Sequence, residues 1–254
     1  MLTKDQAFQY LDEHGPRISI GAYIDNVAVE QVNPEVRRTA ASLIKPFIFY
    51  FVLKNREIFQ DNISIDEIPL TNDTILRFFT GSLLNLNGLL SLMIDISDNA
   101  VSNYFLDRAG MGTINGFLKS EGFKGTTFGR RFLDSEARKA GNENYTTVSD
   151  LRRLFHGILS GKLLGDEERR LFVDILKTQF DRSKFAFYLP EAIESGGKSG
   201  VLDNVWNDLI FFEEGGKNVM LIALTENMPD STARDLLASY SYHFIKERFP
   251  ESLK

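Results

Sequence analysis

The sequence lacks cysteine altogether, which excludes disulfide bonds, thiolate catalysis and cysteine-ligated metal sites. Histidine is almost as scarce, since His14, His156 and His243 are scattered along the chain. A Gly-x-Ser-x-Gly turn is also missing, so a Ser-His-Asp hydrolase is not expected. The sequence has neither a His-Glu-x-x-His cluster nor a Gly-x-x-x-x-Gly-Lys-Ser/Thr loop. We therefore expect no metal ion, no nucleotide and no other cofactor.

Further absences concern membranes and location. No apolar run approaches the length of a membrane span, and the charged opening residues lack the apolar core of a signal peptide. The net charge of −6 gives no electrostatic reason to bind nucleic acid or an anionic membrane. As written, the sequence predicts a soluble monomer without an export signal, cytoplasmic unless a leader has been removed. We expect no nucleic-acid partner and no membrane span.

With 254 residues, 43% of them hydrophobic and 25% charged, the chain has an ordinary globular composition and can bury a large core. Its hydrophobic periodicity changes along the chain between helical and strand-like. The predicted strands span residues 17–24, 27–31, 194–200, 205–212 and 218–225. The predicted helices span residues 3–13, 42–54, 73–79, 87–95, 98–108, 112–121, 147–159, 166–179 and 231–248, the last capped by Asp230 or Ser231.

This order indicates an α+β fold in which one antiparallel sheet is built from both chain ends and flanked by helices. The long helical insertion, with no regular strand–helix alternation, predicts a separate all-helical lobe. We expect one lobe with the sheet from residues 1–40 and 189–254, and a helical lobe from residues 41–188. Because the sequence has no repeats, low-complexity tracts or flexible linkers, the two lobes should pack tightly together.

The segment Ser42-Leu43-Ile44-Lys45 opens an apolar predicted helix. Positions i and i+3 lie on one helix face, so the Lys45 amine can reach the Ser42 hydroxyl. A serine hydroxyl is a weak nucleophile, and a nearby amine of lowered pKa can take its proton. The segment from Ser195 to Lys198 has the same spacing. It lies in a glycine-rich strand, where i and i+3 face opposite ways, so we reject that copy as a nucleophile–base pair.

Two more polar motifs follow along the chain. Ser97-Asp98-Asn99 opens a predicted helix, where such residues are common N-caps, and we expect Asp98 to be a buried structural carboxylate. Lys198-Ser199-Gly200 lies on a predicted strand and, taken alone, is typical of an exposed turn. Each motif alone favours a structural interpretation. Their combination and order outweigh these separate interpretations.

The three motifs resemble the Ser-x-x-Lys, Ser-Asp-Asn and Lys-Thr-Gly set of class A β-lactamases and penicillin-binding proteins, with Lys-Ser-Gly here in place of Lys-Thr-Gly. The resemblance extends past the motifs and covers about residues 5–249, including residues 41–45, 89–103, 145–147 and 207–210. It implies a β-lactamase/transpeptidase-like fold and a small-molecule substrate such as a β-lactam, a peptide or an ester.

The same resemblance implies a chemical role for four side chains. Ser42 would attack a carbonyl and become acylated. Lys45 would accept the proton, since burial and the nearby cation of Lys198 both lower its pKa. Ser97 would relay a proton to the leaving nitrogen.

It also implies how the substrate is held. Asn99 would hydrogen-bond the substrate amide, and Lys198 with Ser199 would hold its carboxylate. The backbone N–H groups of Ser42 and Val201 would form an oxyanion hole. Gly200 would let the substrate approach the strand closely.

One departure from that family concerns release of the acyl group. Class A β-lactamases place a glutamate in their omega-type loop to activate the deacylating water. The corresponding residues 132–138 do not reproduce that pattern, so Glu136 or Asp134 substitutes for it, or both are simply exposed loop carboxylates. The sequence thus leaves three hypotheses open: a β-lactamase-like serine hydrolase, a D-Ala-D-Ala peptidase- or esterase-like enzyme with slow deacylation, and a non-catalytic ligand-binding or sensor domain of the same fold.

Overall fold

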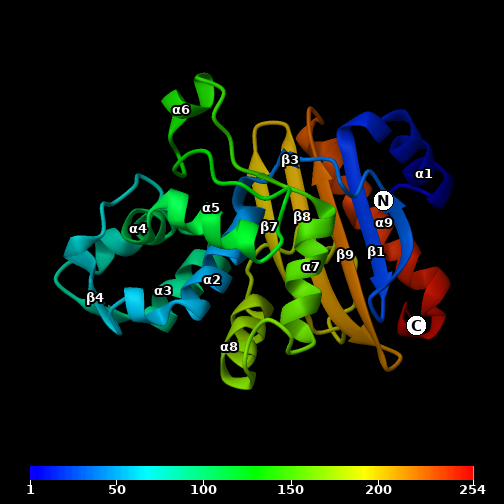
Figure 1. Cartoon of the computed structure of the whole chain (residues 1–254). Helices are drawn as coiled ribbons and strands as arrows, with labels where there is room; N and C mark the ends of the chain where they lie inside the picture. Colours follow the sequence, from blue (N-terminus) through cyan, green and yellow to red (C-terminus); the bar gives the residue numbers. More distant parts are fainter. Residues whose placement is uncertain (254) are drawn as a thin grey trace.

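A five-stranded antiparallel sheet stands at the centre of the computed structural model, which describes residues 1–253 (Figure 1). The strands lie in the order β2-β1-β9-β8-β7. The first strands of the chain therefore pair directly with the last ones, and the predicted α+β fold is confirmed. The bounds are β1 (Ile18–Ile24), β2 (Val27–Val32), β7 (Ser195–Leu202), β8 (Val205–Glu214) and β9 (Lys217–Thr225).

Helices cover both faces of the sheet, and its inner strand β8 carries apolar side chains on both sides. Along β8, Leu209 and Phe211 pack into a hydrophobic cluster with the helices that follow Ser42 in the chain. Ile210 and Phe212 point the opposite way, into a second cluster with α1 (Lys4–Glu13) and α9 (Asp230–Arg248). Figure 1 shows α1 and α9 on one side of the sheet and α7 and α8 on the other.

The helical part of the chain is organised around α2 (Lys45–Lys54). Its residues from Lys45 to Leu53 are all buried, as expected for a helix that is apolar all round. The other helices pack around it or against the sheet: α3 (Leu86–Asp95), α4 (Asn99–Ala109), α5 (Met111–Ser120), α6 (Ser135–Lys139), α7 (Val148–Leu159) and α8 (Asp166–Lys177). Both hydrophobic clusters include residues of the sheet, and the division into lobes at residues 40 and 189 stays a prediction.

The predicted helix 73–79 is wrong, because only a 3-10 turn, Leu76–Phe78, forms there. Side chains take the hydrogen bonds that a helix would use. The Thr74 hydroxyl accepts from the backbone N–H of Leu76 at 3.1 Å and donates to a buried carboxylate, that of Asp98, at 2.6 Å. The Arg77 guanidinium donates to backbone carbonyls of the same segment.

Two smaller corrections concern helix starts. The N-cap of α9 is Pro229, not Asp230 or Ser231, and no side chain caps it. The Asp230 carboxylate instead accepts a hydrogen bond from the Trp206 indole. Residues Ala41–Ile44 form a 3-10 turn, so α2 itself begins at Lys45 rather than at Ser42.

Short strands absent from the sequence prediction fix the loops near the motifs. β3 (Arg38–Thr39) pairs with β6 (Tyr145–Thr146), and β4 (Asn62–Ser64) pairs with β5 (Leu83–Asn85). The β3–β6 pair ties the chain just before Ser42 to the end of the loop that carries α6. Across residues 1–253, no helix combines the length and the apolar character that crossing a membrane requires.

Candidate active site

Ser42 lies in the 3-10 turn Ala41–Ile44 that leads into α2. Ala41, directly before it, has a φ of +48°, a left-handed conformation that costs a non-glycine residue about 1 kcal/mol. The turn is held by the backbone N–H of Ala40, which donates to Asn144 O at 2.8 Å. Ser42 is half-buried among buried neighbours. Backbone strain beside a partly accessible serine is typical of a functional position.

The Lys45 side chain is fully buried, and its amine reaches the second motif. Its Nζ donates to Ser97 O at 2.5 Å, to Ser97 Oγ at 3.1 Å and to Asn99 Oδ1 at 2.9 Å. Ser97 has a φ of +60°, so a second strained residue lies at the site. The Ser42 hydroxyl has no hydrogen-bond partner within residues 1–253, while its carbonyl accepts from the backbone N–H of Lys45. Catalytic hydrogen bonds are often completed only when substrate binds.

Burial is the main cause that lowers the pKa of Lys45 well below its ordinary value, and the Lys198 cation acts in the same direction. The carboxylates of Asp98 and Asp73 oppose the shift. A lowered pKa favours the neutral form of the amine. A neutral amine is the form that accepts a proton.

Strand β7 brings the third motif against the same turn. A Cβ at Gly200 would lie 2.6 Å from Leu43 N, 2.9 Å from Ala40 O and 3.0 Å from Ser42 N. Only a glycine permits this approach, because all three contacts are backbone atoms. The sequence predicted that Gly200 admits substrate. Here the chain itself approaches Gly200, and Val201 therefore lies beside the Ser42 turn.

Asn207, which pairs with Gly200 across the sheet on β8, hydrogen-bonds the residues that lead into the Ser42 turn. Its Nδ2 donates to Thr39 O at 2.8 Å and to Ala40 O at 3.1 Å, and its Oδ1 accepts from the backbone N–H of Thr225 at 2.8 Å. A fully buried amide with its donors and acceptor used in this way holds β8, β9 and the turn in one geometry.

Lys198 and Ser199 are both buried on β7, and the Lys198 amine donates to Ser199 O at 2.9 Å. Burial lowers the pKa of Lys198 to about 8, and the Lys184 cation adds to this effect. Lys198 in turn lowers the pKa of Lys45. Val201 is exposed.

Asp98 plays the structural part expected of it. The carboxylate is buried, caps α4 by accepting from the backbone N–H of Val101 at 3.1 Å, and accepts from the Thr74 hydroxyl at 2.6 Å. Both oxygens are thus occupied by structural hydrogen bonds, and the cap sets the start of α4 at Asn99.

The Lys45 amine also lies over an aromatic ring, that of Phe132, at 4.7 Å from the ring centroid. Asn103 fixes this residue from both sides: the backbone N–H of Phe132 donates to Asn103 Oδ1 at 2.8 Å, and Asn103 Nδ2 donates to Phe132 O at 3.1 Å. Phe132 is itself buried. Neither Phe132 nor Asn103 was expected at the site from the sequence. Asn103 nevertheless lies one helical turn after Asn99, on the same face of α4.

The two carboxylates that the sequence offered for activating water are engaged elsewhere. Asp134 caps α6 by accepting from the backbone N–H of Ala137 at 2.9 Å. Glu136 is exposed on α6 and pairs with Lys139 at 2.9 Å. Figure 1 shows α6 standing away from the sheet, at the top of the view. No hydrogen bond joins either carboxylate to Lys45 or Ser42 within the described chain.

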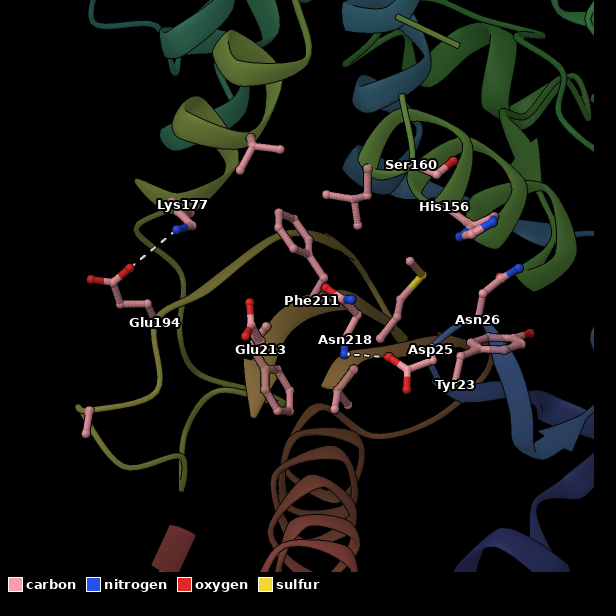
Figure 2. Close-up of a pocket in the computed structure, with 16 residues that line it drawn as sticks. Tyr23, Asp25, Asn26, His156, Ser160, Lys177, Glu194, Phe211, Glu213 and Asn218 are labelled. Carbon is pink, nitrogen blue, oxygen red and sulfur yellow. Dashed lines mark hydrogen bonds and ion pairs between the residues drawn. The ribbon is translucent and has the colours of Figure 1, made fainter. Parts of the chain in front are cut away.

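A cavity of about 620 Å³ lies at the opposite end of the sheet from Gly200, near the β8–β9 hairpin (Figure 2). Tyr23, Phe211 and Asn218 of the sheet face His156 of α7 and Ser160, the residue directly after α7, across it. None of the motif residues lines it, so the cavity is separate from the Ser42 site. Among residues 1–253, no group of three or more His, Asp or Glu side chains is placed to hold a metal ion.

Comparisons with known proteins agree with this arrangement. A sequence model of the β-lactamase enzyme family matches residues 5–245, and the chain belongs to that family. A search of curated proteins gives no match. The family and the fold support a hydrolase of the β-lactamase or transpeptidase kind.

Solved structures share the fold at low identity. The β-lactamase of Sphaerobacter thermophilus DSM 20745 has a TM-score of 0.81 and 21% identity over 97% of each chain. A variant of the last common ancestor of Gram-negative class A β-lactamases has a TM-score of 0.82 and 16% identity, over 96% of this chain and 97% of that one. PBP-A has a TM-score of 0.77 and 21% identity over 95% of each chain.

Proposed function

We propose that this protein is a serine acyl-transfer enzyme that forms an acyl-enzyme at Ser42 with a β-lactam or a related amide or ester. The observation that carries the proposal is the Lys45 amine. It is fully buried, follows Ser42 by one turn and contacts both Ser97 and Asn99. A buried amine of lowered pKa, in reach of two polar groups of a second motif, has little structural purpose, because burying it costs free energy.

In the proposed acylation step, the neutral Lys45 amine takes the Ser42 proton as Oγ bonds to the substrate carbonyl carbon. The backbone N–H groups of Ser42 and Val201 stabilise the oxyanion. The C–N bond then breaks, and the leaving nitrogen receives a proton from Ser97, which is replenished from Lys45. The distance of 3.1 Å between Lys45 Nζ and Ser97 Oγ supports this relay.

The substrate would be oriented by groups on both sides of Ser42. Asn99, at the start of α4, would bind the substrate amide. Lys198 and Ser199 on β7 would bind a carboxylate. The close packing of Gly200 on the Ser42 turn supports this, since it holds β7 at the nucleophile.

We further propose that the acyl group is released slowly. The Phe132 ring lies 4.7 Å from the Lys45 amine, and an aromatic ring can neither activate nor orient a water molecule. Asp134 and Glu136 are engaged on α6. Of the two enzyme hypotheses, the peptidase- or esterase-like one with a long-lived acyl-enzyme is therefore better supported than fast β-lactam hydrolysis.

Mixing the protein with a fluorescent penicillin tests this proposal. We expect a covalent adduct by gel fluorescence and intact mass, retained for many minutes after excess reagent is removed. Ser42→Ala should abolish it. Ser195→Ala, which removes the serine of the rejected Ser-x-x-Lys copy, should leave it unchanged. An adduct that survives Ser42→Ala, or no adduct with any penicillin or ester donor, would overturn acylation at Ser42. Rapid turnover would overturn only the slow release.

A further inference from the structure

Asp73 lies beside the proposed amide-binding residue, in the segment that the sequence wrongly predicted to be helical. Its Oδ2 accepts from Asn99 Nδ2 at 2.6 Å, and its Oδ1 accepts from the Thr71 hydroxyl at 2.6 Å. Asp73 is exposed, whereas Asn99 is half-buried and has its Oδ1 on the Lys45 amine. An accessible carboxylate is thus linked through Asn99 to the candidate catalytic amine, by two hydrogen bonds.

The segment around Asp73 is built to hold that position. The Thr74 hydroxyl anchors it to the buried Asp98 at 2.6 Å. Arg77 braces it from the other side, donating to Thr74 O at 3.1 Å and to Thr71 O at 3.2 Å. A carboxylate on a segment fixed by side-chain hydrogen bonds is preorganised to bind a partner at little entropic cost.

The negative charge of Asp73 is not neutralised by a neighbouring cation. The Arg77 guanidinium is used on backbone carbonyls, and no ion pair joins Asp73 to any side chain that the structure describes. Each carboxylate oxygen has a further lone pair after its one hydrogen bond, so the group can accept from a ligand as well.

We propose that Asp73 selects acyl donors that carry a protonated amine next to the amide that Asn99 binds, as an aminoacyl group does. This inference rests on the proposed function. Asn99 Nδ2 has two hydrogens, of which Asp73 takes one and the substrate carbonyl can take the other. An amine on the carbon beside that carbonyl then lies within ion-pair distance of Asp73, about 4 Å.

Two penicillins that differ by a single amine test the inference. Ampicillin carries an amine on the carbon next to its side-chain carbonyl, and benzylpenicillin has hydrogen there. We expect acylation by ampicillin to have a second-order rate constant about fivefold higher. Asp73→Asn should bring the ratio of the two constants close to one. Salt should reduce the preference of the wild-type protein, because the pair is partly exposed.

The ratio separates specificity from general effects on catalysis. Burial dominates the lowered pKa of Lys45, but Asp73 opposes it, so Asp73→Asn will also change acylation by both compounds. That common change cancels in the ratio. Asp166→Asn, which removes an exposed carboxylate on α8, is the matched control and should leave the ratio as in the wild type.

The outcomes distinguish this inference from the proposed function. Adducts at equal rates with the two penicillins, or a preference for ampicillin that survives Asp73→Asn, would overturn the inference and leave acylation at Ser42 standing. If neither penicillin forms an adduct, the inference is overturned. If no ester donor forms one either, the proposed acylation at Ser42 is overturned with it.

Discussion

The two sides of the Lys45 amine differ in chemistry. Toward α4 the amine meets polar atoms of Ser97 and Asn99, at 2.5 to 3.1 Å. Toward the loop of residues 129–147 it meets the face of the Phe132 ring at 4.7 Å. The polar groups on the first side are those that the proposed acylation step uses, whereas the ring on the second side offers no hydrogen-bonding atom. The difference teaches that, in the proposed mechanism, forming an acyl-enzyme and releasing it make separate demands on the side chains around Lys45.

The two sides also differ in what holds them. Asn99 starts α4 under the cap of Asp98, and Gly200 packs on the Ser42 turn through backbone contacts. On the Phe132 side, Asn103 holds the backbone of Phe132 through two hydrogen bonds, and the side chain packs in the hydrophobic core. A single change at Phe132 can therefore alter the second side with little effect on the first.

Removing the amine itself should have the largest effect. Lys45→Met keeps the length and burial of the side chain but removes the proton acceptor. We expect the rate of acylation by benzylpenicillin to fall about 1,000-fold, the usual size of a general-base contribution. Folding should be retained, because methionine avoids the cost of burying an amine. Stopped-flow acylation and thermal unfolding measure the two. Acylation within tenfold of the wild type would show that Lys45 is not the base.

Motif spacing predicted local features of the candidate site from the sequence. Ser42 and Lys45 at i and i+3, and Asn99 at the start of α4, are local relations that helix geometry fixes. Gly200 was recognised as a point of close approach. What approaches it is the turn of residues 40–43, which is a tertiary contact that no local pattern encodes.

The other side was missed for the same physical reason. Phe132 has the sequence signature of an ordinary core residue in a loop, and only the fold brings its ring to Lys45. Asp73 was hidden by a helical pattern over 73–79 that side-chain hydrogen bonds of Thr74 and Arg77 override. Asn103 could have been identified from the sequence, because its position four residues after Asn99 places it on the same face of α4.

Disturbing the contact between β7 and the nucleophile turn should have the second largest effect. In Gly200→Ala the new Cβ would meet backbone atoms of Ala40, Ser42 and Leu43 at 2.6 to 3.0 Å, so the strand and the turn must separate. We expect acylation to slow about 100-fold, as for a small misplacement of reacting groups. The melting temperature should also fall. The measurements are acylation rate and thermal unfolding.

Gly116→Ala is the matched control for that change. Gly116 lies on α5 with open space around its position, so alanine should stabilise the helix by up to about 1 kcal/mol and leave acylation unchanged. If Gly200→Ala acylates as fast as this control, the close packing of β7 has no bearing on the nucleophile.

A carboxylate placed at Phe132, next to the Lys45 amine, should change the rate at which the adduct is released. Phe132→Glu puts an acceptor next to the Lys45 amine, on a residue that Asn103 holds by its backbone. We expect release of the penicilloyl group to become about tenfold faster, a modest share of what a well-placed general base supplies. Phe132→Gln, similar in size but without the charge, should not accelerate release. Equal release rates in the two variants would rule out a base effect.

The smallest effect concerns pH. In the proposed mechanism Lys45 acts as a neutral amine. Because its pKa lies well below the ordinary value, acylation should rise with pH as that amine loses its proton. The proposed mechanism uses Lys198 as a cation, and its pKa of about 8 means that acylation by a carboxylate-bearing penicillin should fall, by a few-fold, above that pH. Lys198→Arg keeps its charge at alkaline pH and should remove the decline, whatever its effect on the maximum rate. Acylation rates measured at closely spaced pH values across both limbs test this. A wild-type rate that keeps rising through pH 8 would mean that the charge of Lys198 does not hold the substrate. Asn99 would then be the polar side chain left to orient it.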